Sequence, residues 1–349
     1  MTDQGTSAAT AALWESFRGG PVVHCYLCAH HCRVAPGDRG LCGVRENREG
    51  VLYTLTYACP ISAGIDPIEK KPLFHFLPGS SSFSIATVGC NFVCLFCQNA
   101  DISQMPRDQG VVRGMHMEPR EVVERALAGR CRSISYTYTE PTIYFEFADA
   151  CARLADAAGL KNVFVTNGYM TRQALEAIDG RLHAANVDLK SFSDDFYRRM
   201  VGARLKPVLD SIRRLVAMGV WVEVTTLLIP GENDSEDELR RLAGFLVDLD
   251  PNVPWHVSRF HPTYRLRDVP PTPVASVRRA VAIGYEMGLR YVYAGNVPGE
   301  PSESTRCPKC GHLVIERRGF MVERMRLDGD RCRDCGTTIP LVLEGKGGH

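Results

Sequence analysis

The chain has 349 residues, of which 45% are hydrophobic and 23% are charged, so it can bury a large core and is not a disordered polymer. Its 41 basic and 40 acidic side chains give a formal net charge of +1, which excludes a strong overall attraction to nucleic acid or to an acidic membrane. Residues 1–20 lack the apolar core of a signal peptide, and no later stretch is apolar for long enough to span a membrane. We therefore expect a cytoplasmic protein.

Cysteine is the most informative residue type in the composition. Of the 14 cysteines, all but Cys59, Cys131 and Cys151 fall into three tight groups. In a long chain without a secretion signal, grouped cysteines indicate metal sites rather than disulfides. We divide the chain into an N-terminal cysteine-rich module over residues 21–80, a central region over residues 81–300 and a C-terminal module over residues 301–340.

The N-terminal module is rich in proline and glycine and shows little periodicity, which predicts irregular structure. Its cysteine group consists of Cys25, Cys28, Cys32 and Cys42. Four thiolates are compatible with zinc or with a four-cysteine iron–sulfur cluster, and three nearby histidines could replace thiolates as zinc ligands. A pair of disulfides is the remaining alternative, so the metal is left undecided.

The central region alternates strand-like and helix-like segments. The predicted strands are short and rich in Val, Ile, Tyr, Phe and Thr, and they cover residues 83–88, 133–138, 162–166, 184–189, 221–229, 255–260 and 291–293. Segments with apolar residues at helical spacing lie between them, and one begins with a capping box in which Glu238 follows Ser235 by three residues. This alternation implies βαβ units and a parallel sheet. The predicted fold class is therefore α/β, a partial (β/α) TIM-like barrel with small metal-binding modules at both ends, and its chemistry is expected where strands end.

The second cysteine group follows the first predicted strand of the central region. Cys90, Cys94 and Cys97 have the spacing Cys-x3-Cys-x2-Cys. In a helix the first and last of them would lie about 10 Å apart along the axis, so three thiolates that grip one cluster require a loop. An electron-transfer cluster usually has four thiolates, and three would leave one iron of a [4Fe-4S] cluster open to a substrate. The alternatives are three unrelated core cysteines or a zinc site, and zinc would need a fourth ligand.

These three cysteines, with Phe96 before the last of them, resemble the radical S-adenosylmethionine (SAM) superfamily. Their surroundings resemble the pyruvate formate-lyase activating enzyme branch. Residues 66–76, 89–91, 135–141 and 187–190 resemble the AmmeMemoRadiSam group, whose members are linked to Memo-like and AMMECR-like proteins. The resemblance implies a barrel of the radical SAM type, a [4Fe-4S] cluster on the cysteine trio and SAM as cofactor. In such enzymes one electron cleaves SAM to methionine and a 5′-deoxyadenosyl radical, and the protein supplies orientation and seclusion.

The resemblance also implies that a turn after the second predicted strand contacts SAM, together with Phe96. Related enzymes carry a Gly-Gly-Glu-Pro turn there, and this chain has Tyr138 and Thr139 in place of the glycines, followed by Glu140. Glu140 would accept a charge-assisted hydrogen bond from the SAM ammonium group. The alternative is an ordinary strand-end turn in which Pro141 begins the next helix.

Further candidate SAM contacts stand at the ends of later predicted strands. Asn167 follows the third strand, and Asp188 and Lys190 lie on one face at the end of the fourth, where they suit the ribose hydroxyls and the SAM carboxylate. A salt bridge at the barrel rim is the alternative for this pair. By resemblance His261 would touch the SAM ribose, with His256 as a rival candidate.

The third cysteine group indicates a zinc ribbon. It consists of two CxxC pairs, each followed by glycine, formed by Cys307, Cys310, Cys332 and Cys335. Four thiolates would close the coordination shell of a structural zinc ion. An iron site and a thioredoxin-like redox pair are the alternatives, and the second fits poorly because two CxxC pairs occur together outside a βαβ unit.

The leading hypothesis from the sequence is a radical SAM oxidoreductase that cleaves SAM and starts radical chemistry on a small molecule. An activase that generates a radical on a protein partner is a second reading, and a non-catalytic iron–sulfur and zinc scaffold is a third. Expected partners are an electron donor of the flavodoxin or ferredoxin type and, by resemblance, Memo-like and AMMECR-like proteins. A nucleic-acid partner is opposed by the near-neutral charge, and a membrane partner is not expected.

Overall fold

The computed structural model describes residues 8–297, 299 and 301–343. Its centre is an eight-stranded sheet formed by β7 (Ser62–Pro67), β8 (Ser81–Ala86), β9 (Ser133–Tyr136), β10 (Lys161–Thr166), β11 (Ala184–Asp188), β12 (Trp221–Leu228), β13 (Trp255–Arg259) and β14 (Val292–Gly295). These strands follow one another in spatial order from β7 to β14. Strands β8 to β14 are parallel to their neighbours, whereas β7 runs antiparallel to β8. The predicted α/β fold with a parallel sheet is confirmed, and every predicted strand is present with ends shifted by at most two residues.

The sheet is open, because within the described ranges β7 and β14 are edge strands that do not pair with each other. This agrees with a partial barrel. Strand β7 was not expected from the sequence, since its residues include Gly64, Asp66 and Pro67, which disfavour strands. An antiparallel edge position tolerates such residues. The strand lies within residues 21–80, so part of the segment assigned to the N-terminal module belongs to the central sheet.

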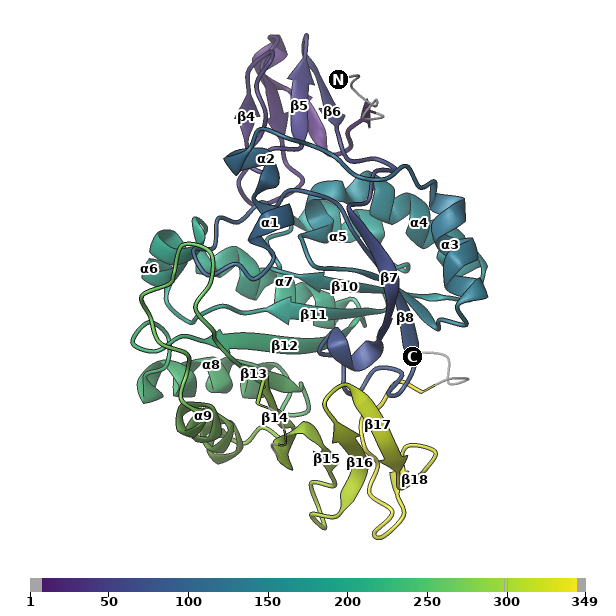
Figure 1. Ribbon diagram of the computed structural model, residues 1–349, viewed down its shortest axis with the longest axis vertical. Helices are drawn as coiled ribbons and strands as arrows, with labels where there is room; N and C mark the ends of the chain where they lie inside the picture. The colour runs from purple at the N-terminus through teal and green to yellow at the C-terminus, as the bar shows by residue number, and fades with distance from the viewer. Residues whose placement is uncertain (1–7, 298, 300, 344–349) are drawn as a thin grey trace.

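Helices follow the strands and cover the outside of the curved sheet (Figure 1). The longer ones are α3 (Pro119–Ala128), α4 (Phe145–Ala157), α5 (Arg172–Ile178), α7 (Leu205–Ala217), α8 (Glu236–Leu249) and α9 (Val274–Met287). The short ones are α1 (Ala100–Ser103), α2 (Met105–Asp108), α6 (Asp194–Phe196), η1 (Phe17–Gly19), η2 (Ile68–Lys70), η3 (Pro141–Tyr144), η4 (Tyr197–Val201) and η5 (Pro301–Glu303). In α7 the residues Val208, Ile212 and Leu215 recur at helical spacing and are buried, as an amphipathic pattern requires. Within the described residues, no helix combines the length and apolar character needed to cross a membrane.

Small sheets flank the central one at both ends of the chain. The N-terminal strands are β1 (Ala9–Thr10), β2 (Trp14–Ser16), β3 (Val23–Cys25), β4 (Arg33–Val34), β5 (Arg45–Arg48) and β6 (Val51–Thr54). The C-terminal strands are β15 (Thr305–Arg306), β16 (Leu313–Arg318), β17 (Met321–Met325), β18 (Leu327–Asp328) and β19 (Arg331–Cys332). In Figure 1 these groups stand at opposite ends of the molecule, above and below the central sheet.

The C-terminal residues pack against the segment between β7 and β8. The backbone of Val342 exchanges hydrogen bonds with His75 (2.9 Å) and Leu77 (2.8 Å). The buried Arg317 donates to the carbonyl oxygen of Phe74 (2.5 Å), and Phe74 packs in one apolar cluster with residues of β14 and β16. The segment between β7 and β8 is thus clamped between the sheet and the last described part of the chain.

Glu223, a buried carboxylate on β12, holds the segment between β7 and β8 by hydrogen bonds. Glu223 Oε1 accepts hydrogen bonds from His75 N (2.8 Å) and Trp221 Nε1 (3.0 Å), and Oε2 accepts from Phe74 N (3.0 Å) and His256 Nε2 (2.7 Å). Burial alone would raise the pKa of Glu223, but the hydrogen bond and charge of His256 and the other donors outweigh it, and the pKa lies below its ordinary value. The ionised, acceptor-only form is therefore the one that the fold uses.

We predict that Glu223→Gln lowers the free energy of unfolding by about 1–3 kcal/mol, because a glutamine has one acceptor oxygen and its amide group would face two donors. Chemical denaturation under anaerobic conditions measures this. Glu323→Gln at an exposed position is the matched control and should change stability by less than about 0.5 kcal/mol. Equal stability of the Glu223→Gln variant and the wild type would contradict the role given to this carboxylate.

Candidate functional site

The loop that follows β8 bears the central cysteine trio. Residues 87–99 contain no helix, so the predicted loop is confirmed. The loop is held by backbone hydrogen bonds from Val93 N to Val201 O (2.9 Å) and from Leu95 N to Met200 O (3.0 Å), both in η4. Gly89 at its start has φ +98°, and an added Cβ would lie 2.8 Å from a Val44 methyl group, so both backbone and space require glycine there.

The trio opens into a cavity of about 390 Å³ at the carboxyl ends of the parallel strands, within the size range of small-molecule sites. The predicted site residues that line it are Cys90, Cys94, Phe96, Cys97, Thr139, Glu140, Asn167, Asp188 and Lys190. Parallel strands bring their carboxyl ends to one edge, which explains why residues so far apart in the sequence meet here.

His261 is the one predicted SAM contact that the structure does not bring into this cavity. It lies beyond the end of β13 and is exposed, and the residue before it, Phe260, is fully buried in the core. His256 does line the cavity, but its Nε2 is bonded to Glu223. Ser258 lines the cavity two residues after His256. Strand alternation, which places these two on one face, was the signal that could have identified Ser258.

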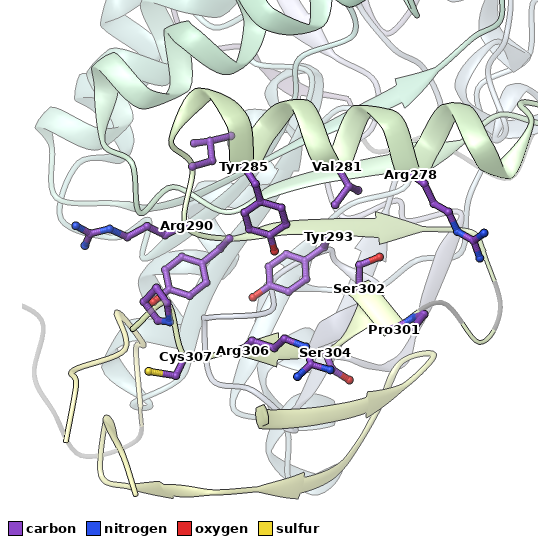
Figure 2. A pocket seen from close by; sticks show the side chains of 13 residues that line it. Arg278, Val281, Tyr285, Arg290, Tyr293, Pro301, Ser302, Ser304, Arg306 and Cys307 are labelled. Carbon is purple, nitrogen blue, oxygen red and sulfur yellow. The ribbon is translucent and has the colours of Figure 1, made fainter. Parts of the chain in front are cut away.

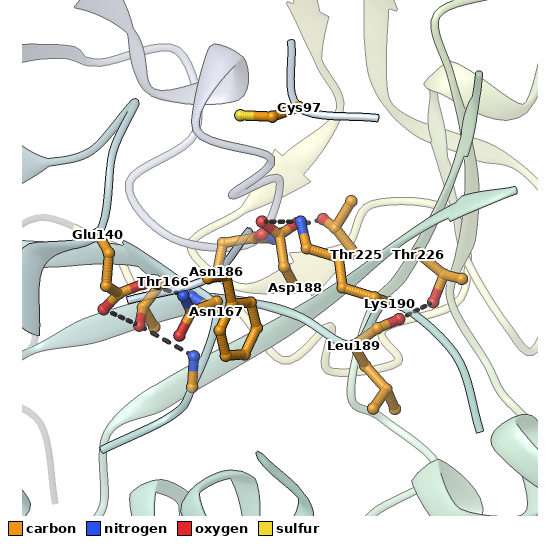
Figure 3. Close-up of polar contacts among 12 residues, drawn as sticks. Cys97, Glu140, Thr166, Asn167, Asn186, Asp188, Leu189, Lys190, Thr225 and Thr226 are labelled. Atoms are coloured by element: carbon orange, nitrogen blue, oxygen red, sulfur yellow. Dashed lines mark hydrogen bonds and ion pairs between the residues drawn. The ribbon is translucent and has the colours of Figure 1, made fainter. Parts of the chain in front are cut away.

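Glu140 is buried and ties two strand ends together. Its Oε1 accepts hydrogen bonds from Thr142 N (3.0 Å), Thr142 Oγ1 (2.5 Å) and Thr166 Oγ1 (2.7 Å), and its Oε2 accepts from Asn167 N (2.7 Å), as Figure 3 shows in part. It is also the N-cap of η3, which begins at Pro141, so the strand-end turn considered as the alternative is present. Burial raises the pKa of this carboxyl group against the effect of its donors. Both carboxylate oxygens of Glu140 accept hydrogen bonds, and the residue therefore fixes the positions of the groups that donate to it.

Asn167 extends this network to the cysteine loop. Its Nδ2 donates to Asn91 Oδ1 (2.7 Å), and Asn91 directly follows Cys90. Its Oδ1 accepts from Tyr169 N (3.0 Å), which fixes the amide plane. The end of β10 thereby sets the position of the first cysteine of the trio.

Asp188 and Lys190 form an ion pair at the end of β11, with Lys190 Nζ 2.7 Å from Asp188 Oδ2. Figure 3 shows the pair between the Glu140 group and Thr225. Burial opposes the charge of Lys190, but Asp188 outweighs it and raises the pKa of the lysine above its ordinary value. Asp188 keeps the larger exposed fraction, 31% of the side chain against 16% for Lys190, so the pair can still meet a ligand from the cavity.

The loop behind this pair is fixed by α8. The predicted capping of α8 is confirmed, since Ser235 Oγ accepts from Glu238 N (3.3 Å). The Glu238 side chain does not complete the capping box. It accepts instead from Phe192 N (2.8 Å) and Ser191 Oγ, and it thereby anchors the residues just after Lys190.

A second polar group lies beside the cavity, and the sequence assigned no role to its residues and did not indicate their contact with Tyr138. Lys71 is almost fully buried, and its Nζ contacts Asp66 Oδ2 (2.7 Å) and Tyr138 Oη (3.2 Å). Burial lowers the pKa of Lys71 to about 8 despite the nearby carboxylate. Tyr138 replaces a glycine of the family turn and keeps a left-handed φ of 62°, a conformation that costs a bulky residue free energy and is held by its polar partners and by Asn99 Nδ2 (2.8 Å to Tyr138 O). The motif over residues 66–76 was the available signal, although it had no assigned role.

The four C-terminal cysteines have the arrangement of a mononuclear metal site. Their sulfur atoms lie within 4.8 Å of one another. The Sγ–Sγ distances are 3.5 Å for Cys307–Cys335 and 3.7 Å for Cys310–Cys332. Tetrahedral zinc with Zn–S bonds of about 2.3 Å places its sulfur ligands roughly 3.8 Å apart, so the residues fit zinc.

A separate hollow of about 520 Å³ lies between α9 and the segment around Cys307 (Figure 2), and none of the predicted SAM contacts lines it.

The four N-terminal cysteines line a different, smaller cavity, and Asn91 of the Cys90 loop is part of its wall. The structure thus brings together each of the three cysteine groups separately.

The chain is similar to several known proteins. A family model described as the radical SAM superfamily matches residues 84–243. An uncharacterized protein of Methanocaldococcus jannaschii is 47% identical over 324 residues, which cover 92% of this chain and 96% of the relative. The pyruvate formate-lyase 1-activating enzyme of Escherichia coli is 23% identical over 220 residues, which cover 59% of this chain and 89% of the enzyme. A solved radical SAM methyltransferase from Sphaerobacter thermophilus superimposes with a TM-score of 0.49 and 19% identity, and covers 68% of this chain and 71% of its own.

We predict that Cys310→Ser removes the C-terminal metal ion and lowers the thermal stability of the C-terminal module, because metal binding and folding are coupled in such modules. Metal analysis should show the loss of about one zinc per chain, with iron unchanged. Cys131→Ala, a buried cysteine outside the three groups, is the control and should keep its zinc. Full zinc content in the Cys310→Ser variant would contradict the assignment.

Proposed function

The chain belongs to the radical SAM superfamily, in the branch homologous to the pyruvate formate-lyase activating enzymes, and from this membership we propose that it reductively cleaves SAM at a [4Fe-4S] cluster bound by Cys90, Cys94 and Cys97. Members of this superfamily are enzymes that use SAM and an iron–sulfur cluster, and they typically need a reductant. The proposed reaction starts radical chemistry on a small molecule, in the manner of an oxidoreductase.

The observation that supports this proposal most directly is the count of thiols in the cavity. Cys90, Cys94 and Cys97 are its only cysteines among the lining residues that the structure describes. Three thiolates suit a [4Fe-4S] cluster with one iron left for a ligand, whereas a purely electron-carrying cluster takes four. When bound, the cluster and SAM supply the one-electron cleavage chemistry, and the chain supplies binding, orientation and exclusion of water.

The chain's own residues divide these tasks. The ion pair of Lys190 and Asp188 offers a cation for the SAM carboxylate and a carboxylate for hydroxyl groups of the ribose. Glu140 positions Asn167 and thereby the cysteine loop, while Thr139 lies beside it at the cavity wall. Phe96, 3% exposed, gives the cavity an apolar surface next to the cysteines.

A small-molecule substrate is favoured over a protein substrate by the position of the trio. Cys94 is 8% exposed and the cavity is walled by strands and by the Tyr138 turn, so a substrate has to enter a confined space. An activase that acts on a protein partner is the alternative within the family, and it would need a flexible peptide to reach in. A non-catalytic iron–sulfur scaffold is the third alternative. The absence of a fourth cysteine from the described lining of the central cavity argues against it.

The remaining parts of the proposal concern organisation and partners. We assign zinc to the C-terminal cysteines and keep three parts, over residues 21–80, 81–300 and 301–340, with β7 contributed to the central sheet by the first. The reductant is proposed to be of the flavodoxin or ferredoxin type, and Memo-like and AMMECR-like proteins are proposed as functional partners in the cytoplasm.

The direct test is anaerobic reconstitution with iron and sulfide, followed by SAM and dithionite and quantification of 5′-deoxyadenosine. We expect wild-type protein to form it and Cys94→Ala to lose the central cluster and form none. Cys59→Ala, outside all three groups, is the matched control and should behave as wild type. Equal product from the Cys94→Ala variant would show that the trio is not the catalytic centre.

We further predict that Lys190→Met keeps the central cluster but weakens SAM binding roughly ten- to a hundredfold, because a charged hydrogen bond of about 1.5–3 kcal/mol is lost. Titration of the oxidised cluster with SAM measures the affinity. Lys206→Met is the control, since that lysine is 82% exposed and pairs with Asp210 on its own helix. Wild-type affinity in the Lys190→Met variant would make the lysine a rim residue without a role in SAM binding.

A further inference from the structure

The N-terminal cysteines surround a small, narrow cavity of about 20 Å³. It is lined by all four thiols, Cys25, Cys28, Cys32 and Cys42. They come from the end of β3, the turn that follows it, the residue before β4 and the segment before β5. A hydrogen bond from Cys25 N to Cys32 O (2.9 Å) brings the first three together. No disulfide joins them among the described residues, so their sulfur atoms are available to an occupant.

The spacing of these thiols differs from that of the C-terminal group. The C-terminal sulfur atoms lie within 4.8 Å of one another, which leaves room for a single ion. Among the residues that the structure describes, no other group of metal-ligating side chains has its ligand atoms this close together. The N-terminal thiols instead face a space between them. In a cubane each thiolate binds a different iron, so the thiols stand farther apart than around one zinc ion and enclose a volume.

Two buried residues with unpaired donor atoms point to an anionic occupant. The Arg45 side chain is 2% exposed, and although its Nη2 is 2.8 Å from Glu146 Oε1, its Nε and Nη1 have no hydrogen-bond partner. Asn91 Nδ2 is likewise buried and unpartnered. Both residues line the cavity. Buried donors left unpaired cost free energy, and a cluster with four thiolates carries net negative charge and sulfur acceptors that would satisfy them.

Apart from His30, whose Nε2 is bonded to Asn91 O, the rest of the wall is mostly apolar. Leu27, Val34 and Ile143 line the same cavity and are buried in the main hydrophobic core. Such a shell restricts the access of water to a cluster and leaves the thiolates, Arg45, Asn91 and His30 as the polar groups around it.

We propose that Cys25, Cys28, Cys32 and Cys42 bind a second [4Fe-4S] cluster, which passes single electrons to the central site. All four irons have a thiolate, so this cluster has no position for SAM, and carrying an electron is the chemistry left to it. One electron enters from a reduced flavodoxin- or ferredoxin-type donor, which is oxidised, and leaves to the central cluster, and no bond is made or broken at the N-terminal site.

The two sites are connected through Asn91 in the Cys90 loop. Asn91 stands in the wall of the N-terminal cavity, follows Cys90 in the sequence and receives the hydrogen bond from Asn167. His30 Nε2 lies 2.8 Å from Asn91 O, which bonds the N-terminal turn to the same loop. The binding of the cluster stands independently of the proposed function, whereas the electron-transfer role rests on it.

The experiment for binding uses full-length protein purified and reconstituted without oxygen. We expect about eight irons and one zinc per wild-type chain, and about four irons in a Cys90→Ser/Cys94→Ser/Cys97→Ser variant, with an electron paramagnetic resonance signal after reduction that does not respond to SAM. Four irons and two zinc ions in the wild type, or no iron in the triple variant, would overturn the proposal. The wild-type metal count decides the matter if the variant does not fold.

The experiment for electron transfer uses Cys28→Ser/Cys42→Ser, with Cys59→Ser as the matched control. The measured quantity is the rate of 5′-deoxyadenosine formation with reduced flavodoxin divided by the rate with dithionite. We expect this ratio to fall by about tenfold in the double variant and to stay at the wild-type value in the control. An unchanged ratio in a double variant that has lost about four irons would overturn the relay but not the second cluster. Absence of product from wild-type protein with either reductant would instead contradict the proposed function.

Discussion

The position of the central cysteines depends on one buried carboxylate. Glu140 accepts four hydrogen bonds from the start of η3 and the end of β10, and Asn167 then passes this constraint to Asn91 beside Cys90. A loop of this length has few backbone hydrogen bonds of its own, so its shape has to be imposed by its neighbours. The burial of the Glu140 carboxyl group is tolerated because both of its oxygens accept hydrogen bonds. The strand ends and the cysteine loop therefore form one unit.

The sequence predicted the parts of the fold that are set by local pattern. Strands such as Trp221–Leu228 are apolar and β-branched, and their existence follows from composition and alternation alone. Strand β7 was not predictable in this way, because a segment with Gly64, Asp66 and Pro67 becomes a strand only through its pairing with β8. The cysteine trio and the Asp188–Lys190 pair were found from spacing. The Lys71–Tyr138 contact was not, since it joins residues 67 positions apart that no local pattern connects. His261 was placed by resemblance, and the exposure of its loop depends on tertiary packing.

One residue type serves three geometries in this chain. The C-terminal thiols converge until their sulfurs nearly touch, the central thiols open into a cavity shared with charged side chains, and the N-terminal thiols face a mostly apolar space with two residues that have unpaired donor atoms. Sequence spacing separates the first case from the others, because two CxxC pairs are diagnostic of a four-sulfur ion site. It does not separate an ion from a cluster for the N-terminal group, since that difference lies in the distances across the site and in what lines it.

The packing of the last described residues on the segment between β7 and β8 has a consequence for how the protein is made. Val342 pairs with the backbone of His75 and Leu77, and Arg317 reaches Phe74, so contacts near the beginning of the central region wait for residues synthesised about 240 or more positions later. On the ribosome the segment between β7 and β8 can bind Glu223 once β12 has emerged, but it lacks its C-terminal partners until nearly the whole chain has been made. During that interval the sheet presents uncovered edges and apolar surface, which is the state in which multistrand proteins aggregate. The yield of folded protein therefore depends on whether translation is completed before incomplete chains associate with one another.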